Sequence, residues 1–273
     1  MTPPPAESGY SLVWSDDFAG AAGSLPNQSK WNIINAGPNA GNSEVQHYTQ
    51  STSNSSLSGS GALHITPQHS NGQWTSARLE CKEAFNCPDG HRMLFQAELR
   101  TGTFPANQQA GIWPAFWALG NDIRNGKNVS WPQCGEWDIL ENAHGADFSL
   151  ATLHYGRGGT DHLSLGGGGN SNARRTFQVE SFHTWALKVN RTPSNWQDET
   201  LEWWLDGNKF FQIKGSDVGD GELWGRVAHK SFFPILNVAV GSNFPGGGQP
   251  DGNTTTGLGS GLQVNYVAIY RTN

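Results

Sequence analysis

A chain of 273 residues can form one large all-β domain or two ordinary domains, so its length alone does not choose between them. With 35 Gly, 12 Trp and 13 Phe but only 15% charged residues, the composition describes a turn-rich aromatic protein and excludes a disordered or mainly helical one. A formal net charge of -6 argues against a nucleic acid or an anionic membrane as partner and fits a neutral ligand such as a polysaccharide.

The first nine residues, which include three consecutive prolines, are expected to be a flexible lead-in, and residues 10–273 a single domain. This start lacks the basic and apolar regions of a signal peptide, which indicates a mature or truncated chain. No run of eighteen apolar residues occurs, so we expect no membrane partner. Glycosylation sequons favour a secreted, extracellular glycoprotein, and they begin at Asn27, Asn54, Asn128, Asn190 and Asn253.

Short runs typical of β-strands recur along the chain, separated by segments rich in Gly, Asn and Ser. They cover residues 10–14, 62–67, 78–82, 92–100, 115–119, 136–141, 149–155, 183–190, 201–205, 208–213, 232–240 and 262–270. Asp16-Asp17-Phe18 is expected to start a surface segment, residues 51–61 a loop, and residues 220–230 the one helical turn. This spacing predicts an all-β sandwich rather than a βαβ fold.

The chain has three cysteines, an odd number. Cys81 and Cys87 flank a predicted turn, and we expect a disulfide between them in an oxidising compartment. Cys134 would then be a buried, small apolar residue rather than a nucleophile. No zinc-binding or redox spacing is present, so the cysteines predict no metal site.

Three carboxylates lie within six residues, in Glu136-Trp137-Asp138-Ile139-Leu140-Glu141. Side chains alternate along a strand, so Glu136 and Asp138 share one face and plain alternation puts Glu141 on the other. A β-bulge at Ile139 or Leu140 would return Glu141 to the face of the other carboxylates. A solvent-facing acidic edge strand is the alternative, but it would not need the bulky apolar residues that surround these carboxylates.

With one bulge the two glutamates are four register steps apart, or about 13 Å between Cα atoms at 3.3 Å per residue. On a concave sheet their carboxyl groups could approach the separation of about 5 to 5.5 Å that retaining glycosidases use. Three like charges this close cannot all ionise freely, so at least one pKa should rise, as a general acid requires. The spacing alone does not decide which Glu attacks the sugar.

The Glu-x-Asp-x-x-Glu pattern resembles the signature of glycoside hydrolase family 16, in its bulged, laminarinase-like (endo-β-1,3-glucanase) branch. Further matching segments follow in the family's order, over residues 42–49, 76–79, 111–120 and 236–246. The resemblance implies a β-jelly roll of two curved antiparallel sheets with a concave substrate groove. It also implies that Glu136 is the nucleophile, Glu141 the general acid/base, and Asp138 the residue that hydrogen-bonds to the nucleophile and tunes its charge.

The resemblance further implies which residues bind sugar. Trp113 is expected to stack against sugar, whereas Trp117 is as well explained as a core residue. Asn42 is expected to bind sugar, but Glu44 and Arg78 could simply form an ion pair that supports the groove wall. His154 matches a histidine on the leaving-group side of the family's site, and Asn243 would sit on a loop at the groove end.

We therefore expect a secreted, monomeric endo-β-glucanase that cleaves β-1,3 or mixed β-1,3/1,4 glucan with retention and needs no cofactor. A transglycosylase with the same Glu pair remains open, and a non-catalytic glucan-binding protein on the same fold is the alternative from another class. Many relatives carry a structural calcium on the convex side, where Asn265 replaces the usual Asp and weakens a site for a hard cation.

Overall fold

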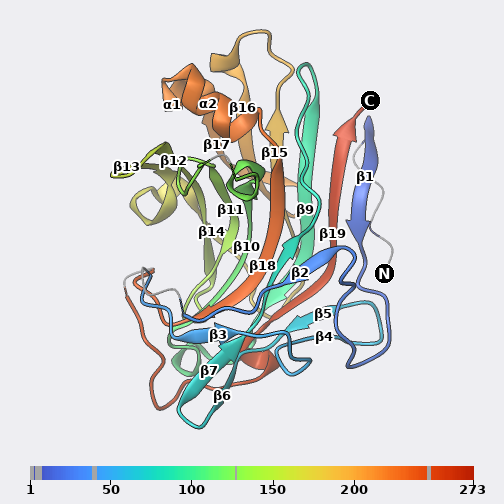
Figure 1. The fold of residues 1–273 in the computed structure, drawn as a ribbon, viewed down its shortest axis with the longest axis vertical. Coiled ribbons are helices and arrows are strands. Elements are labelled where there is room, and N and C mark those ends of the chain that lie inside the picture. Colours follow the sequence, from blue (N-terminus) through green and yellow to red (C-terminus); the bar gives the residue numbers. More distant parts are fainter. Residues whose placement is uncertain (1–2, 4–7, 39–41, 127, 245–246) are drawn as a thin grey trace.

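The computed structural model describes residues 3, 8–38, 42–126, 128–244 and 247–273 (Figure 1). The predicted lead-in at residues 1–9 therefore lies mostly outside the described residues, as does the end of the 236–246 segment. The described strands form two eight-stranded antiparallel sheets and a small three-stranded one. None of the helices in the described ranges combines the length and the hydrophobicity needed to cross a bilayer.

The sheet that we name sheet A carries β1 on β19 and otherwise runs in the order β17-β16-β15-β9-β19-β5-β4. These strands are β17 (Asn208–Lys214), β16 (Thr200–Leu205), β15 (His183–Asn190), β9 (Arg92–Thr101), β19 (Leu262–Thr272), β5 (Leu63–Ile65), β4 (Ser55–Leu57) and β1 (Tyr10–Asp16).

The facing sheet, sheet B, carries β14 on β12 and otherwise runs in the order β13-β12-β11-β10-β18-β8-β2. These strands are β13 (Asp161–Gly166), β12 (Phe148–Gly158), β11 (Glu136–Glu141), β10 (Ile112–Gly120), β18 (Phe232–Val240), β8 (Arg78–Cys81), β2 (Trp31–Ile33) and β14 (Arg174–Thr176).

Small elements close the ends of the sandwich. The third sheet consists of β3 (Gln46–Tyr48), β7 (Gln73–Ser76) and β6 (Gln68–Ser70), and the α-helices are α1 (Gly215–Val218) and α2 (Gly221–Ala228). Single 3-10 turns cover Ala106–Gln108, Asn121–Arg124, Gly167–Gly169, Ser171–Ala173, Trp196–Asp198 and Leu258–Ser260.

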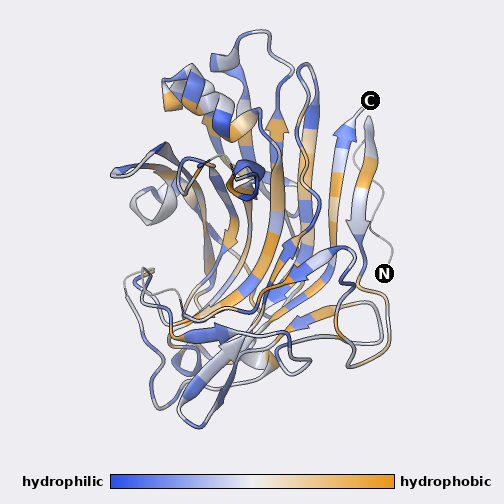
Figure 2. Cartoon of the chain, in the orientation of Figure 1, coloured by the Kyte–Doolittle hydropathy of each residue, from blue (hydrophilic) through white to orange (hydrophobic). Residues whose placement is uncertain are grey.

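The hydrophobic core fills the space between sheets A and B, and apolar residues follow the central strands in Figure 2. All nine residues of β18 are buried. Trp137 of β11 stacks on Phe232 of β18 with ring centroids 3.6 Å apart and meets Phe95 of β9, in the other sheet, edge-on at 5.3 Å. Because alternate residues of β11 enter this core, the intervening ones point out of the sandwich on the other side of sheet B.

The predicted sandwich is confirmed, and three strands have the predicted bounds: Glu136–Glu141, His183–Asn190 and Phe232–Val240. Strand β4 lies within the predicted 51–61 loop. The predicted surface segment at Asp16 is wrong, because β1 extends to Asp16, which is 5% exposed and accepts a hydrogen bond from Trp31 Nε1 at 2.8 Å. Phe18 is buried beside Trp31, with which it stacks.

The predicted disulfide between Cys81 and Cys87 is not formed in the structure, where both thiols and Cys134 are free and buried. Phe85, between the two, exchanges backbone hydrogen bonds of 2.8 and 2.9 Å with Phe232 of β18. The segment is held extended there, and the Cys87 thiol packs against the backbone carbonyls of His91 and Val189 instead. Burial raises the pKa of all three thiols to about 12, as expected for unreactive core cysteines.

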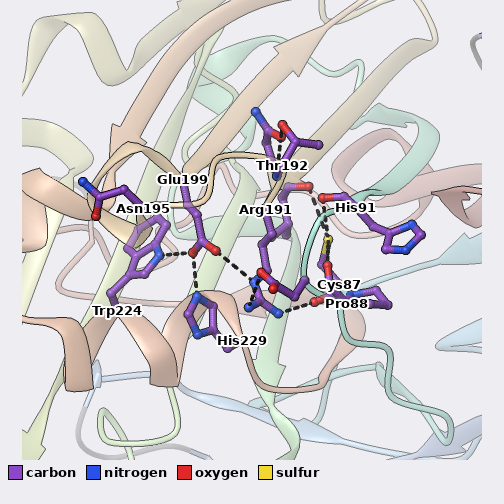
Figure 3. A network of polar contacts seen from close by, with 12 residues as sticks. Cys87, Pro88, His91, Arg191, Thr192, Asn195, Glu199, Trp224 and His229 are labelled. Carbon is purple, nitrogen blue, oxygen red and sulfur yellow. Dashed lines mark hydrogen bonds and ion pairs between the residues drawn. The ribbon is translucent and has the colours of Figure 1, made fainter.

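A buried carboxylate, that of Glu199, ties α2 to the ends of β15 and β16 in sheet A (Figure 3). It accepts hydrogen bonds from Trp224 Nε1 at 2.5 Å and lies 2.6 Å from His229 Nε2, while its other oxygen pairs with Arg191 Nε at 3.1 Å. Trp224 belongs to α2, and Arg191 directly follows β15. The helix supports sheet B in turn, because the backbone carbonyl of Val227 accepts a 2.9 Å hydrogen bond from Trp137 Nε1.

Candidate active site

Strand β11 contains the predicted bulge, and the extra residue is Ile139. Against β10, Asp138 pairs with Trp117 and Leu140 with Phe116, so Ile139 has no partner of its own. Against β12, the register shifts by one residue between Asp138 and Glu141. Ile139 and Leu140 are both fully buried in the core, and the side chain of Glu141 therefore returns to the face that carries Glu136 and Asp138.

The polar backbone groups at this bulge have partners within the protein. The carbonyl of Asp138 accepts a 2.7 Å hydrogen bond from Trp203 Nε1, which reaches across from sheet A. The amide of Glu141 donates to Ser149 Oγ at 3.0 Å. Together with the packing of Trp137, these bonds fix the strand on both sides of the irregularity, so the three carboxylates sit on a rigid element.

All three carboxylates line a groove of about 470 Å³ on the face of sheet B away from the core. Glu136 pairs with Leu119 of β10 and Glu141 with Ala115, four register steps apart as predicted. The other lining residues come mainly from β10, β18 and the segments around β3 and β8: Asn42, Glu44, Tyr48, Arg78, Trp113, Ala115, Trp117, Leu119, Ile123, Trp131, Asn237 and Ala239.

The environments of Glu136 and Glu141 differ, although both pKa values are raised. Burial, followed by the charge of Asp138, raises the pKa of Glu136 to about 8, while nearby His154 and Arg78 and a 3.2 Å hydrogen bond from Trp131 Nε1 favour its charged form. Burial and the charges of Asp138 and Glu136 raise the pKa of Glu141 well above its usual range. Polar contacts with Trp113 and Thr152 offset part of that rise, but no cation does, so Glu141 is the better proton holder of the two.

His154 lies opposite Glu136 on β12, not beside Glu141 as its expected position on the leaving-group side suggested. Its Nε2 is 3.3 Å from Asp138 Oδ2 and 3.9 Å from Glu136 Oε1. Burial alone would lower the pKa of His154, but the adjacent carboxylate of Asp138 and the charge of Glu136 outweigh it and raise the pKa. His154 therefore favours the ionised form of Glu136 more than that of Glu141.

The sequence did not single out two further residues at this end of the groove, Trp131 and His162. Trp131 is 43% exposed, and its ring lies 4.5 Å from that of His162 and 5.8 Å from that of His154. His162 Nε2 is 2.9 Å from His154 Nδ1. Trp131 lies in a loop and His162 on the short strand β13, so no periodic pattern placed them near the carboxylates.

Trp113 and Trp117 occupy the groove face of β10, and both are half-buried. Trp113 stacks on Phe244 at 4.9 Å. Trp117 also packs against the core and donates from Nε1 to Asn237 Oδ1 at 2.7 Å. Trp117 thus lines the groove and also packs against the core, as both the sugar-binding and the core interpretation of the sequence require.

Arg78 and Glu44 both line the groove, but they do not pair with each other, so the alternative of a supporting ion pair between them is wrong. The guanidinium lies 2.7 Å from Glu80, two residues along the same strand face, and stacks 4.7 Å from the Trp117 ring centroid. Glu44 instead accepts hydrogen bonds from Asn42 Nδ2 at 3.2 Å and Gln46 Nε2 at 2.6 Å.

Asn243 is exposed and is not among the residues that line the groove. Its backbone amide donates to the carbonyl of Asn42 at 3.0 Å, so it supports the end of the groove through the backbone. Tyr48 and Asn237 do line the groove, and sequence reasoning missed both. Asn237 Nδ2 donates to the Tyr48 hydroxyl at 3.1 Å.

The residues at the convex-side position implied for calcium do not provide a set of ligands that suits this ion. Asn265 donates from Nδ2 to Glu98 Oε2 at 2.7 Å. One amide and one carboxylate provide few of the six to eight oxygen ligands that calcium takes. Within the described part of the chain, the only group of three potential metal ligands among His, Cys, Asp and Glu is Glu136 and Asp138, which line the groove, with His154 beside them.

A half-buried and a buried glutamate with unequal proton affinity, set in an aromatic groove, define a carbohydrate-cleaving site of the glycosidase class. The family model described as "XgeA-like, catalytic GH16 domain" matches residues 36–195. The chain belongs to glycoside hydrolase family 16, and its fold is the jelly roll of that family's laminarinases.

Similar proteins agree with this assignment. An endo-1,3-β-glucanase structure from Streptomyces sioyaensis has 34% identity and a TM-score of 0.86, with all of both chains covered. Glucan endo-1,3-β-glucosidase A1 of Niallia circulans is 29% identical over 98% of this chain, which spans only 39% of that protein. A LamA structure from Zobellia galactanivorans in complex with laminaritriose and laminaritetraose has 26% identity and a TM-score of 0.70, covering 95% of this chain and 98% of that one.

Proposed function

We propose that this chain is a retaining endo-β-glucanase that hydrolyses internal β-1,3 linkages of laminarin-like glucan, and also mixed β-1,3/1,4 glucan. The observation that carries the proposal is the pair Glu136 and Glu141, four register steps apart on one face of β11 in a groove lined by tryptophans. The enzymes named above as 1,3-β-glucanases and the LamA complex with laminari-oligosaccharides support the same substrate class.

The unequal surroundings of the two glutamates support their roles. Glu136, next to His154, Arg78 and the Trp131 N–H, is favoured as the carboxylate that attacks the anomeric carbon. Glu141, which holds its proton more tightly, donates that proton to the leaving oxygen. In the second step Glu141 takes a proton from water, the water attacks the anomeric carbon, and the bond to Glu136 breaks with overall retention.

The position of the carboxylates along the groove supports internal cleavage. Trp131 and Ile123 line the groove near Glu136, at the end of β10 where Gly120 lies. Trp113 lies near the opposite end of β10 and stacks on Phe244. The residue before Phe244, Asn243, donates a backbone hydrogen bond to the carbonyl of Asn42 at that end of the groove. Binding surface therefore extends on both sides of the reacting groups, as an endo-acting enzyme requires.

We further propose a secreted monomer that needs no cofactor for the reaction. The sequons at Asn27, Asn128 and Asn253 are exposed and are compatible with glycosylation. Asn54 is 1% exposed and donates to Thr66 O at 3.0 Å, so a glycan there would disrupt the fold.

The test is a product profile on laminarin and barley mixed-linkage glucan, with proton NMR on the first product formed. Short β-configured oligosaccharides from laminarin are expected, whereas products longer than the substrate would indicate transglycosylation. Glu136→Gln should lower turnover by on the order of 10³-fold or more while glucan binding persists. Glu98→Gln, whose side chain faces away from the core on sheet A, is the matched control. Full activity in Glu136→Gln would refute the proposal, and binding without turnover in the unaltered chain would favour a glucan-binding protein.

A further inference from the structure

The three groups on the Glu136 side of the groove have the composition of a transition-metal site. Glu136, Asp138 and His154 each offer a ligand atom, and these atoms all lie within 4.8 Å of one another. One imidazole nitrogen and two carboxylate oxygens suit zinc or similar ions, whereas calcium and magnesium prefer oxygen ligands alone. Three protein ligands with further positions open to water are the usual arrangement of an accessible zinc site.

The distances between these groups suit a single ion. Two ligands that share a tetrahedral zinc at 2.0 to 2.2 Å lie about 3.3 to 3.6 Å apart. His154 Nε2 is 3.3 Å from Asp138 Oδ2, which is such a tetrahedral edge. Glu136 Oε1 is 3.9 Å from the same nitrogen, and all three ligand atoms lie within 4.8 Å of one another, so the Glu136 side chain would move toward the other two ligands to complete the set.

Asp138 provides an independent indication that the site accepts a ligand. Asp138 is 3% exposed, and its Oδ2 has no well-aligned hydrogen-bond donor among the described residues. The polar group recorded beside this buried oxygen is His154 Nε2, 3.3 Å away in a contact that does not align as a hydrogen bond, so an ion bound between the two atoms would satisfy it.

His162 orients His154 for coordination. To bind an ion through Nε2, the imidazole must carry its proton on Nδ1, and Nδ1 lies 2.9 Å from His162 Nε2, which can accept that proton's hydrogen bond. Metal-binding histidines nearly always donate from their second nitrogen in this way. The ring of Trp131, 4.5 Å from that of His162, packs against the arrangement from the solvent side.

We propose that Glu136, Asp138 and His154 bind Zn²⁺ or a similar divalent transition ion, and that the bound ion reversibly inhibits the enzyme. Coordination engages the lone pairs of the carboxylate that would attack the sugar and places a cation in the groove. The inhibition rests on the proposed function, because it requires Glu136 to be the nucleophile. The binding does not, since it depends only on the three ligand atoms and on His162.

Binding is tested by calorimetric titration of Zn²⁺ into the full chain without glucan, with Mg²⁺ titrated in parallel. One zinc per chain is expected, with much weaker binding of Mg²⁺. His154→Gln should abolish that site, and His162→Ala should weaken it by about 10 to 100-fold, the usual effect of removing an outer-shell partner. His47→Gln is the matched control, because His47 is an exposed histidine outside the groove and should leave the affinity unchanged.

Glu141→Gln separates this inference from the proposed function. This variant keeps all three ligands, so it should bind zinc like the unaltered chain while glucan hydrolysis is lost. In the unaltered chain, Zn²⁺ should inhibit laminarin hydrolysis and EDTA should restore it. An unchanged zinc affinity in His154→Gln, or equal binding of Mg²⁺, would overturn the site. Zinc binding that leaves hydrolysis intact would overturn the inhibition alone.

Discussion

Replacing Asp138 by Asn should move the whole pH profile of the enzyme to lower pH. The charge of Asp138 helps to raise the pKa of Glu136, to about 8, and that of Glu141, well above its usual range. In the proposed mechanism turnover requires Glu136 ionised and Glu141 protonated, so the acid limb of kcat/KM should report Glu136 and the basic limb Glu141. Removing a negative charge next to both groups lowers both pKa values, and both limbs follow.

The size of the shift follows from the register. Asp138 is two strand steps from each glutamate, or about 6.6 Å at 3.3 Å per step. At an effective dielectric constant of about 20, two unit charges at this separation interact by about 2.5 kcal/mol, which corresponds to almost 2 pKa units. The pKa of His154 also falls without Asp138, which removes part of the positive charge beside Glu136. We therefore expect the acid limb to move down by about 1 unit and the basic limb by about 2.

The assay is kcat/KM on laminarin across pH for the unaltered chain and for Asp138→Asn. Glu44→Gln is the matched control, because Glu44 lines the same groove but is not among the charges that shift either catalytic glutamate. That variant should change binding and leave both limbs in place. Limbs that stay fixed in Asp138→Asn, or that move to higher pH, would refute the electrostatic reasoning.

Two further substitutions test other parts of the structure. Trp131→Phe removes the N–H that donates to Glu136 Oε2 at 3.2 Å and so favours its ionised form. The acid limb of the kcat/KM profile should therefore move up by about one pH unit or less, and a limb that does not move would show that this hydrogen bond has no effect on the ionisation of Glu136. Glu199→Gln removes the buried carboxylate that pairs with Arg191 and His229, which should cost about 3 kcal/mol and lower Tm by about 6 to 12 °C without loss of activity at 25 °C. A Tm change below about 2 °C on differential scanning calorimetry would contradict that account.

The sequence could predict the bulge because its cause is local. Glu136 and Asp138 alternate correctly, whereas Glu141 is one residue out of phase, and the two apolar residues before it both favour burial. Only one extra residue reconciles these preferences, and the structure places it at Ile139. The central strands were equally predictable, since long apolar runs such as Phe232–Val240 leave few alternatives to a fully buried strand.

Contacts between distant segments could not be predicted in the same way. Arg78 could pair with either Glu44 or Glu80, and it pairs with Glu80 because the two side chains share one face of β8. Glu44 instead accepts hydrogen bonds from its neighbours Asn42 and Gln46. His154 lies next to Glu136 because of the register between β11 and β12, which depends on the bulge. The expected disulfide failed for a similar reason, since the bridge between Phe85 and Phe232 decides where Cys87 packs.

The bulge also explains how a single strand supplies both of the carboxylates proposed to be catalytic. Without the extra residue, alternation would turn the Glu141 side chain into the space that Ile139 and Leu140 occupy, among fully buried apolar groups. An unpaired carboxylate there would be strongly destabilising, and the site would lose its proton donor. The indole of Trp203 and the hydroxyl of Ser149 stabilise the irregular backbone from two sides. Local backbone geometry, rather than the presence of two glutamates alone, therefore determines whether this strand can carry out acid/base and nucleophilic chemistry together.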